Sequence, residues 1–223
     1  MNTYLDGEGG VFMEKSYTKI YTTGATVPLK IRPGHFATNH AHINYYIDVT
    51  TLKARTKEAE EVAQALVGMY DAVIDTIVCM EGTEVIGAFL AEELAKGGFL
   101  STNAHKSIYV ISPEFNNNSQ IIFRDNLIPM IRDKHVMILM ASVTTGRTLN
   151  KAVESIQYYG GILQGASAIF SAMDSLDGVP IKSVFGKKDL PDYTYSDYRD
   201  CPLCKAGKKI DALVNTFGYS PMG

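Results

Sequence analysis

The chain has 223 residues, of which 46% are hydrophobic, and a formal net charge of −3 with scattered basic residues. This composition suits one sizeable domain with a small appendage; it excludes a disordered chain and argues against a nucleic-acid binder, which would show a basic face. No apolar stretch reaches the roughly 18–20 residues of a membrane span, and the first residues contain no apolar signal core. With three cysteines, which fit a reducing compartment, we expect a cytoplasmic protein.

The first 53 residues differ in composition from the segment that follows. Residues 1–16 are acidic and glycine-rich and are expected to form a loose arm. Residues 17–53 are rich in Thr, Tyr and Ile and contain Pro and Gly turn signals, so they predict short strands ending at residues 43–49. We expect residues 1–53 to form an arm and a small hood over the next domain.

From residue 56 onward, helical and apolar segments alternate. Apolar residues at helical spacing predict helices over residues 56–70, 85–94 and 149–156. Mainly apolar runs predict strands at residues 73–80, 107–111, 136–141, 162–170 and 181–185, and the first of them is expected to be buried on both faces. Strands that alternate with helices indicate an α/β domain over residues 54–190, with a Rossmann-like parallel sheet covered on both faces.

Residues 191–223 are expected to form a C-terminal appendage. It contains Cys201-Pro202-Leu203-Cys204, a C-x-x-C that resembles one knuckle of a zinc ribbon. A closed zinc site needs four ligands, and the sequence has no second C-x-x-C. The favoured interpretation is therefore a turn without metal, leading into a helix that packs through Ile210, Leu213 and Val214. The alternative is a zinc ion shared between two chains, each contributing Cys201 and Cys204.

The strongest functional signal lies at residues 136–154, where an apolar strand runs into a hydroxyl-rich turn before a helix. The turn consists of Thr144, Thr145, Gly146, Arg147 and Thr148. Glycine permits a tight turn, the threonines offer hydroxyl donors, and the first N–H groups of a helix are unpaired. This arrangement predicts a phosphate site, and an ordinary capped turn is the alternative.

This segment resembles the signature of the type I phosphoribosyltransferases. In that family an apolar strand precedes two acidic residues, two apolar residues and T-T-G-x-T, and residues 136–148 match the spacing throughout. The resemblance implies a homodimer of Rossmann-like subunits in which loop 144–148 holds the 5-phosphate of phosphoribosyl pyrophosphate (PRPP). Among these enzymes the chain is most similar to orotate phosphoribosyltransferase, over about residues 17–186.

The similarity to the orotate enzymes implies roles for other residues. The residues expected to approach a nucleobase are Lys30, Arg32 and His35. The residues expected in the pyrophosphate-binding loop are Glu81, Gly82 and Thr83. The implied activity is transfer of a phosphoribosyl group from PRPP, with Mg²⁺, to a nucleobase in pyrimidine nucleotide synthesis or salvage.

The chain departs from the family pattern at the ribose and the pyrophosphate. Met140 and Ala141 face the ribose in place of the two acids, which should weaken ribose binding by roughly 3–6 kcal/mol if nothing substitutes. Thr83 stands where the orotate enzymes tend to have a lysine. Glu81 and Glu84 would repel a pyrophosphate unless Mg²⁺ intervenes, although Glu84 also suits the first turn of a helix capped by Thr83.

A third departure concerns the catalytic loop. Residues 113–120 contain no Lys or His, whereas the orotate enzymes carry catalytic basic residues there. Arg124 is the nearest substitute, with His105 and Lys106 on the other side.

The remaining histidines of the hood and the overall function leave alternatives open. His35, His40 and His42 are conceivable metal ligands, but their spacing in a strand-rich segment predicts poor ligand geometry, so no metal is expected there. The protein is either an orotate phosphoribosyltransferase-like enzyme or a non-catalytic protein that binds a nucleotide or sugar phosphate. The second alternative would keep the phosphate loop and lose the acidic pair.

Overall fold

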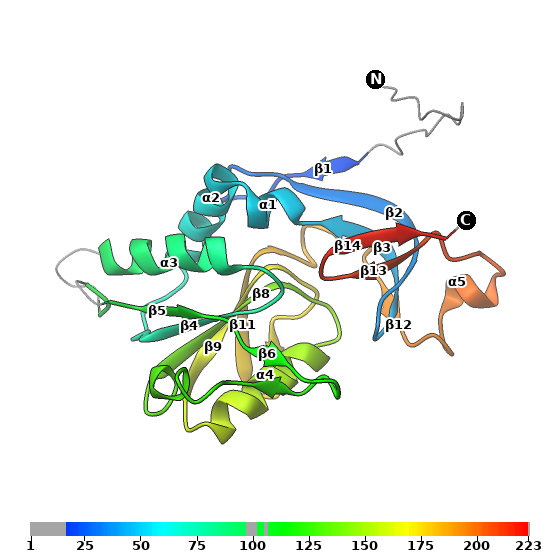
Figure 1. Ribbon diagram of the computed structural model, residues 1–223. Helices are drawn as coiled ribbons and strands as arrows, with labels where there is room; N and C mark the ends of the chain where they lie inside the picture. The colour runs from blue at the N-terminus through cyan, green and yellow to red at the C-terminus, as the bar shows by residue number, and fades with distance from the viewer. Residues whose placement is uncertain (1–16, 97–101, 105–106, 223) are drawn as a thin grey trace, which may run out of the picture.

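The computed structural model describes residues 17–96, 102–104 and 107–222, which form two six-stranded sheets and one short hairpin (Figure 1). The expected arm at residues 1–16 lies outside the described residues, as do His105 and Lys106.

The core sheet is built from the central part of the chain. Its strands, in order across the sheet, are β10 (Ser175–Leu176), β11 (Val179–Gly186), β9 (Ile162–Ser171), β8 (His135–Val143), β4 (Thr76–Cys79) and β5 (Tyr109–Ile111). The strand pairs are parallel except for the β10–β11 hairpin, which is antiparallel. The parallel sheet predicted from the sequence is confirmed.

Helices cover both faces of the core sheet, so most residues of its central strands β4, β8 and β9 are buried. The helices are α1 (Thr50–Ala54), α2 (Thr56–Val67), α3 (Glu84–Lys96) and α4 (Arg147–Tyr158), with the short 3₁₀ helix η1 (Ile128–Met130). Along β8, Leu139 packs in the core on the side of α2 and α3, while Ile138 and Met140 pack on the side of α4. Among the described helices, none combines the length and the apolarity needed to cross a membrane.

The second sheet, here called the hood sheet, lies above the core sheet in Figure 1 and joins both ends of the described chain. Its strands are β12 (Tyr195–Ser196), β3 (His42–Asp48), β2 (Leu29–Ala37), β13 (Ala212–Asn215) and β14 (Gly218–Pro221), with β1 (Thr18–Ile20) paired to β2. β2 pairs antiparallel with β3 and parallel with β13. The C-terminal residues therefore complete the hood.

The helix expected around residues 210–214 is a wrong prediction. This segment forms β13, which pairs Ala212 and Leu213 with Phe36 and Ala37 of β2 and continues into β14. Three apolar residues do not define a helical period, and the open edge of β2 offers backbone partners that the local sequence does not reveal. The helix in this region is α5 (Pro202–Lys205), which carries the C-x-x-C.

Candidate functional site

Loop 144–148 connects the carboxyl end of β8 to the N-terminus of α4. Gly146 directly precedes the helix with φ 74°, and a Cβ there would lie 2.9 Å from a methyl carbon of Leu176. The left-handed backbone favours glycine, and any larger residue would also require Leu176 to shift. In the described residues no side chain caps α4, and its first turn contains no acid. No side-chain cap or acid of this turn therefore competes with an anion for its N–H groups.

Basic side chains surround this loop. Arg147 is exposed at the start of α4, and Lys151 follows in the same helix. The pKa of His40, from the β2–β3 turn of the hood, is lowered first by burial and then by the charges of Arg147 and Lys151. His40 thus lies within the field of these two cations, so an anion bound at the loop would attract all three residues.

A cavity of about 210 Å³ lies between the loop and the hood sheet. Its lining includes loop 144–148 with Met140 and Ala141, Glu81 and Lys53, the hood residues His40 and Tyr46, and Asn215 and Thr216 of the C-terminal hairpin. Small-molecule sites usually measure about 300–1,000 Å³, so this cavity suits a compact ligand. The hood covers the carboxyl ends of the parallel strands, where ligands bind in such sheets.

The side chain of Glu81 brings a carboxylate to the end of β8, beside the apolar residues Met140 and Ala141. Its backbone has a left-handed φ of 60°, which is rare for a residue with a side chain and marks a locally strained turn. Its Oε2 accepts the N–H of Ser142 at 3.3 Å. Burial raises the pKa of Glu81, and the N–H groups of Ser142 and Ala141 and the charge of Lys53 only partly oppose this shift.

Lys53 supplies a cation beside the 81–83 loop, although its sequence context gives no such signal. Its Nζ donates to the carbonyl of Glu81 at 2.6 Å and to that of Thr216 at 3.1 Å. Burial lowers the pKa of Lys53, and Glu81, Glu84 and Asp48 partly oppose this. Lys53 therefore joins the core sheet's loop to the C-terminal hairpin of the hood.

Thr83 has a structural role. It is fully buried, and its hydroxyl donates to the carbonyls of Met80 and Leu139 at 2.9 and 3.0 Å. Glu84 lies in the first turn of α3, as expected. Gly82 has a left-handed φ of 79°, which favours glycine, while a Cβ there would make only an ordinary contact of 3.6 Å with Lys53 Nζ.

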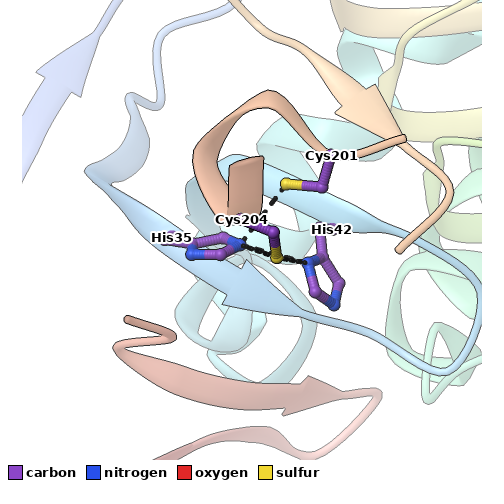
Figure 2. Close-up of side chains that lie close together, drawn as sticks. All are labelled: His35, His42, Cys201 and Cys204. Carbon is purple, nitrogen blue, oxygen red and sulfur yellow. Dashed lines mark hydrogen bonds between the residues drawn. The ribbon is translucent and has the colours of Figure 1, made fainter. Parts of the chain in front are cut away.

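The residues expected to approach a nucleobase do not line the cavity. Lys30 Nζ lies 3.5 Å from the hydroxyl of Thr51. The Arg32 guanidinium lies over the Tyr219 ring, 5.4 Å from its centroid. His35 is fully buried and contacts two cysteines and His42 (Figure 2). Other hood residues, His40 and Tyr46 among them, line the cavity instead.

Arg124 lies outside the cavity as well. Residues 113–120 form strand β6 (Glu114–Phe115) and the turn of a hairpin, and β7 (Ile121–Ile122) is the second strand of that hairpin. Arg124 donates from Nε and Nη2 to one carboxylate oxygen of Glu114, at 2.9 and 2.5 Å, and both side chains are exposed. Arg124 therefore forms a surface ion pair with Glu114, and it is not among the residues that line the cavity.

The structure thus brings loop 144–148, Met140, Ala141 and Glu81 together around one cavity. His40, Lys53 and the hairpin residue Thr216 are additional members that sequence reasoning missed. None of them belongs to a local motif, because each reaches the cavity from a different part of the chain.

No protein-family model and no curated protein sequence matches the chain. Several solved structures, in contrast, are similar to this chain in fold. A phosphoribosyltransferase from Corynebacterium diphtheriae has a TM-score of 0.52 at 14% identity, covering 72% of this chain and 90% of that one. Orotate phosphoribosyltransferase of Mycobacterium tuberculosis H37Rv has a TM-score of 0.50 at 15% identity, with 73% and 92% covered. UMP synthase of Leishmania donovani has a TM-score of 0.52 at 18% identity, and the match covers 72% of this chain and 34% of the synthase.

Proposed function

Because this chain has the type I phosphoribosyltransferase fold, we propose that it binds PRPP and transfers the phosphoribosyl group to a nucleobase. One observation carries the proposal: a glycine-shaped anion loop, a carboxylate and an ammonium group face the same small cavity. Phosphate, ribose and pyrophosphate are the parts of PRPP that these groups would bind.

Loop 144–148 would hold the 5-phosphate. The unpaired N–H groups of α4, the threonine hydroxyls and Arg147 are donors for the phosphate oxygens. The Thr144 hydroxyl is itself held 3.0 Å from the hydroxyl of the buried Tyr193, which fixes its orientation. The donors are therefore in place before a ligand arrives, which reduces the entropy lost on binding.

Glu81 would accept the ribose hydroxyls in place of the missing acidic pair. Met140 is almost fully buried and packs in the core on the side of α4, so it offers the sugar only apolar surface. The Glu81 carboxylate reaches the same strand end through its contact with Ser142. A negative charge here would also stabilise the oxocarbenium-like transition state expected for this transfer.

Lys53 would face the pyrophosphate. Thr83 cannot bind this group, because it is fully buried and its hydroxyl is bonded to backbone carbonyls. The described lining residues do not form a resident Mg²⁺ site, since Glu81 is their single carboxylate and its Oε2 already accepts an N–H. Mg²⁺ needs several oxygen ligands in octahedral geometry. We expect Mg²⁺ to enter as the PRPP complex, as part of the substrate.

A second candidate function is binding of a nucleoside monophosphate or sugar phosphate without turnover. It is favoured because Met140 and Ala141 stand in place of the acidic pair while the phosphate loop is kept. Lys30, Arg32 and Arg124 are engaged outside the cavity, so none of these three cations faces an acidic base such as orotate. Neutral bases should therefore be tested beside orotate.

A pyrophosphate-release assay with PRPP, Mg²⁺ and a panel of nucleobases tests the proposal. Turnover with any base, lost in Gly146→Val, would support the transferase. Tight binding of ribose 5-phosphate or a nucleotide in calorimetry, without pyrophosphate release, would instead support the non-catalytic function. Absence of both turnover and binding would contradict the two candidates together.

A further inference from the structure

Four side chains with metal-binding atoms converge at the outer edge of the hood sheet, away from the residues that line the cavity. His35 lies on β2, His42 on β3, and Cys201 and Cys204 at the start of and within α5 (Figure 2). Their ligand atoms all lie within 4.8 Å of one another. These four residues are called the Cys/His cluster below.

The spacing within the cluster matches a tetrahedral metal site. Bond lengths of about 2.3 Å for Zn–S and about 2.0–2.1 Å for Zn–N place ligand atoms roughly 3.3–3.8 Å apart around a tetrahedron. The His35 Nε2 atom lies 3.5 Å from Cys201 Sγ, 3.6 Å from Cys204 Sγ and 3.1 Å from His42 Nδ1. Cys204 Sγ lies 3.2 Å from His42 Nδ1.

The surroundings of His35 fix which ring nitrogen faces the cluster. Its Nδ1 lies 2.9 Å from the carbonyl of Lys208, which can only accept, so Nδ1 carries the proton. Nε2 is therefore the ring nitrogen that faces both sulfur atoms and His42. A carbonyl that holds the far nitrogen of a histidine ligand is the usual outer contact of a zinc site.

We propose that the Cys/His cluster binds one zinc ion within a single chain. Two thiolates and two imidazole nitrogens are the donor set that favours tetrahedral Zn²⁺. Four protein ligands leave no open position, so the ion would stabilise the fold and take no part in catalysis. The zinc knuckle seen in the sequence would be completed by the hood strands, and no second chain would be needed.

The position of the cluster indicates what the metal would hold together. His35 and His42 belong to the N-terminal hairpin of the hood, and α5 leads directly into β13 and β14. The backbone N–H of His35 also donates to the carboxylate of Asp211 at 2.7 Å, just before β13. The ion would thus fasten the C-terminal hairpin, which carries Asn215 and Thr216, over the cavity.

Metal content of the full-length chain without an affinity tag tests the proposal directly. We expect one zinc ion per chain, and loss of the metal in Cys201→Ser/Cys204→Ser. Cys79→Ala is the matched control, because Cys79 is buried in β4 outside the cluster and should leave the zinc content unchanged. Zinc retained in the double variant, or no zinc after reconstitution of the wild type, would overturn the proposal.

Two measurements on the wild-type chain remain decisive if the double variant does not fold. Cobalt substitution should give the intense visible bands of a tetrahedral ion together with a thiolate charge-transfer band. A strong chelator should lower the melting temperature by about 10 °C or more and accelerate hydrogen exchange in β13 and β14, leaving β8 protected. An octahedral cobalt spectrum, an intramolecular disulfide in place of metal, or chelator-independent melting would contradict a zinc site.

Discussion

The floor and the roof of the cavity are built in different ways. The floor is continuous in sequence: β8, loop 144–148 and α4 follow one another within residues 135–158. The roof is the hood sheet, in which β2 and β3 are joined by β13 from the other end of the chain. Bringing such distant segments together costs more loop-closure entropy than forming a local turn.

This difference explains which groups each part contributes to the site. Under the proposed function, the floor would bind an anion through backbone N–H groups that any correctly folded strand–turn–helix unit presents. The roof depends on side chains that meet across long sequence separations, such as Lys53 with Thr216 and His35 with Cys201. Substitutions in the floor should therefore abolish phosphate binding locally, whereas substitutions in the roof should change selectivity or stability.

The largest effect is expected from Gly146→Val in the floor. A β-branched residue would be strained at this φ and would contact Leu176, which displaces the loop. We expect phosphate or sulfate affinity to fall more than about 100-fold in calorimetry, since several donors are lost together. Gly178→Val is the matched control, because Gly178 also has positive φ but no atoms near its missing Cβ. Equal losses in both variants would contradict a local anion site.

Glu81→Gln should separate ligand binding from stability. Loss of the charged acceptor should weaken PRPP by about 10–100-fold and leave inorganic phosphate unaffected. Burial in the folded protein raises the pKa of Glu81 above its value in the unfolded chain. The protonated side chain therefore stabilises the fold at low pH, and this stabilisation is lost as pH rises through the folded pKa.

At neutral pH the buried carboxylate therefore costs stability. The same substitution should raise the melting temperature by about 2–4 °C at pH 7, and the gain should vanish near pH 4. A melting temperature that falls at pH 7, with unchanged PRPP affinity, would show that Glu81 serves the fold alone.

Lys53→Met should act where floor and roof meet. Loss of the ammonium should weaken PRPP by about tenfold relative to ribose 5-phosphate, because only PRPP carries a pyrophosphate. Competition binding with the two ligands measures this ratio. Lys57→Met, on the exposed side of α2, is the control for loss of one positive charge. A ratio that stays constant would assign Lys53 to hood attachment only.

The smallest effect is a pH dependence from His40. Burial, and then the charges of Arg147 and Lys151, hold the pKa of His40 below its ordinary value of about 6.5, and a bound dianion would raise that pKa. Sulfate, which does not titrate here, should therefore bind about threefold more tightly at pH 6 than at pH 8. Calorimetry on His40→Asn should show a flat profile, and an unchanged slope in that variant would exclude His40 as the source.

The sequence by itself determined the core sheet and the floor of the site. Apolar runs and helical periods place β8 and α4, and Thr-Thr-Gly-x-Thr between them predicts loop 144–148, because all of this information is local. The family resemblance also pointed to the 81–83 loop, and the left-handed backbone of Glu81 shows how that loop directs its carboxylate toward β8.

Only the tertiary structure decided the roof. The helix expected near Leu213 became a strand because β2 offers an unpaired edge, and His35 faces α5 because the chain returns there after 166 residues. In the sequence, the histidine pair and the cysteine pair of the Cys/His cluster each supply only two of the four ligands that a zinc site needs. A linear pattern shows spacing along the chain but does not show which strands pair. Pairing across that distance depends on the packing free energy of the whole hood, which no short segment contains.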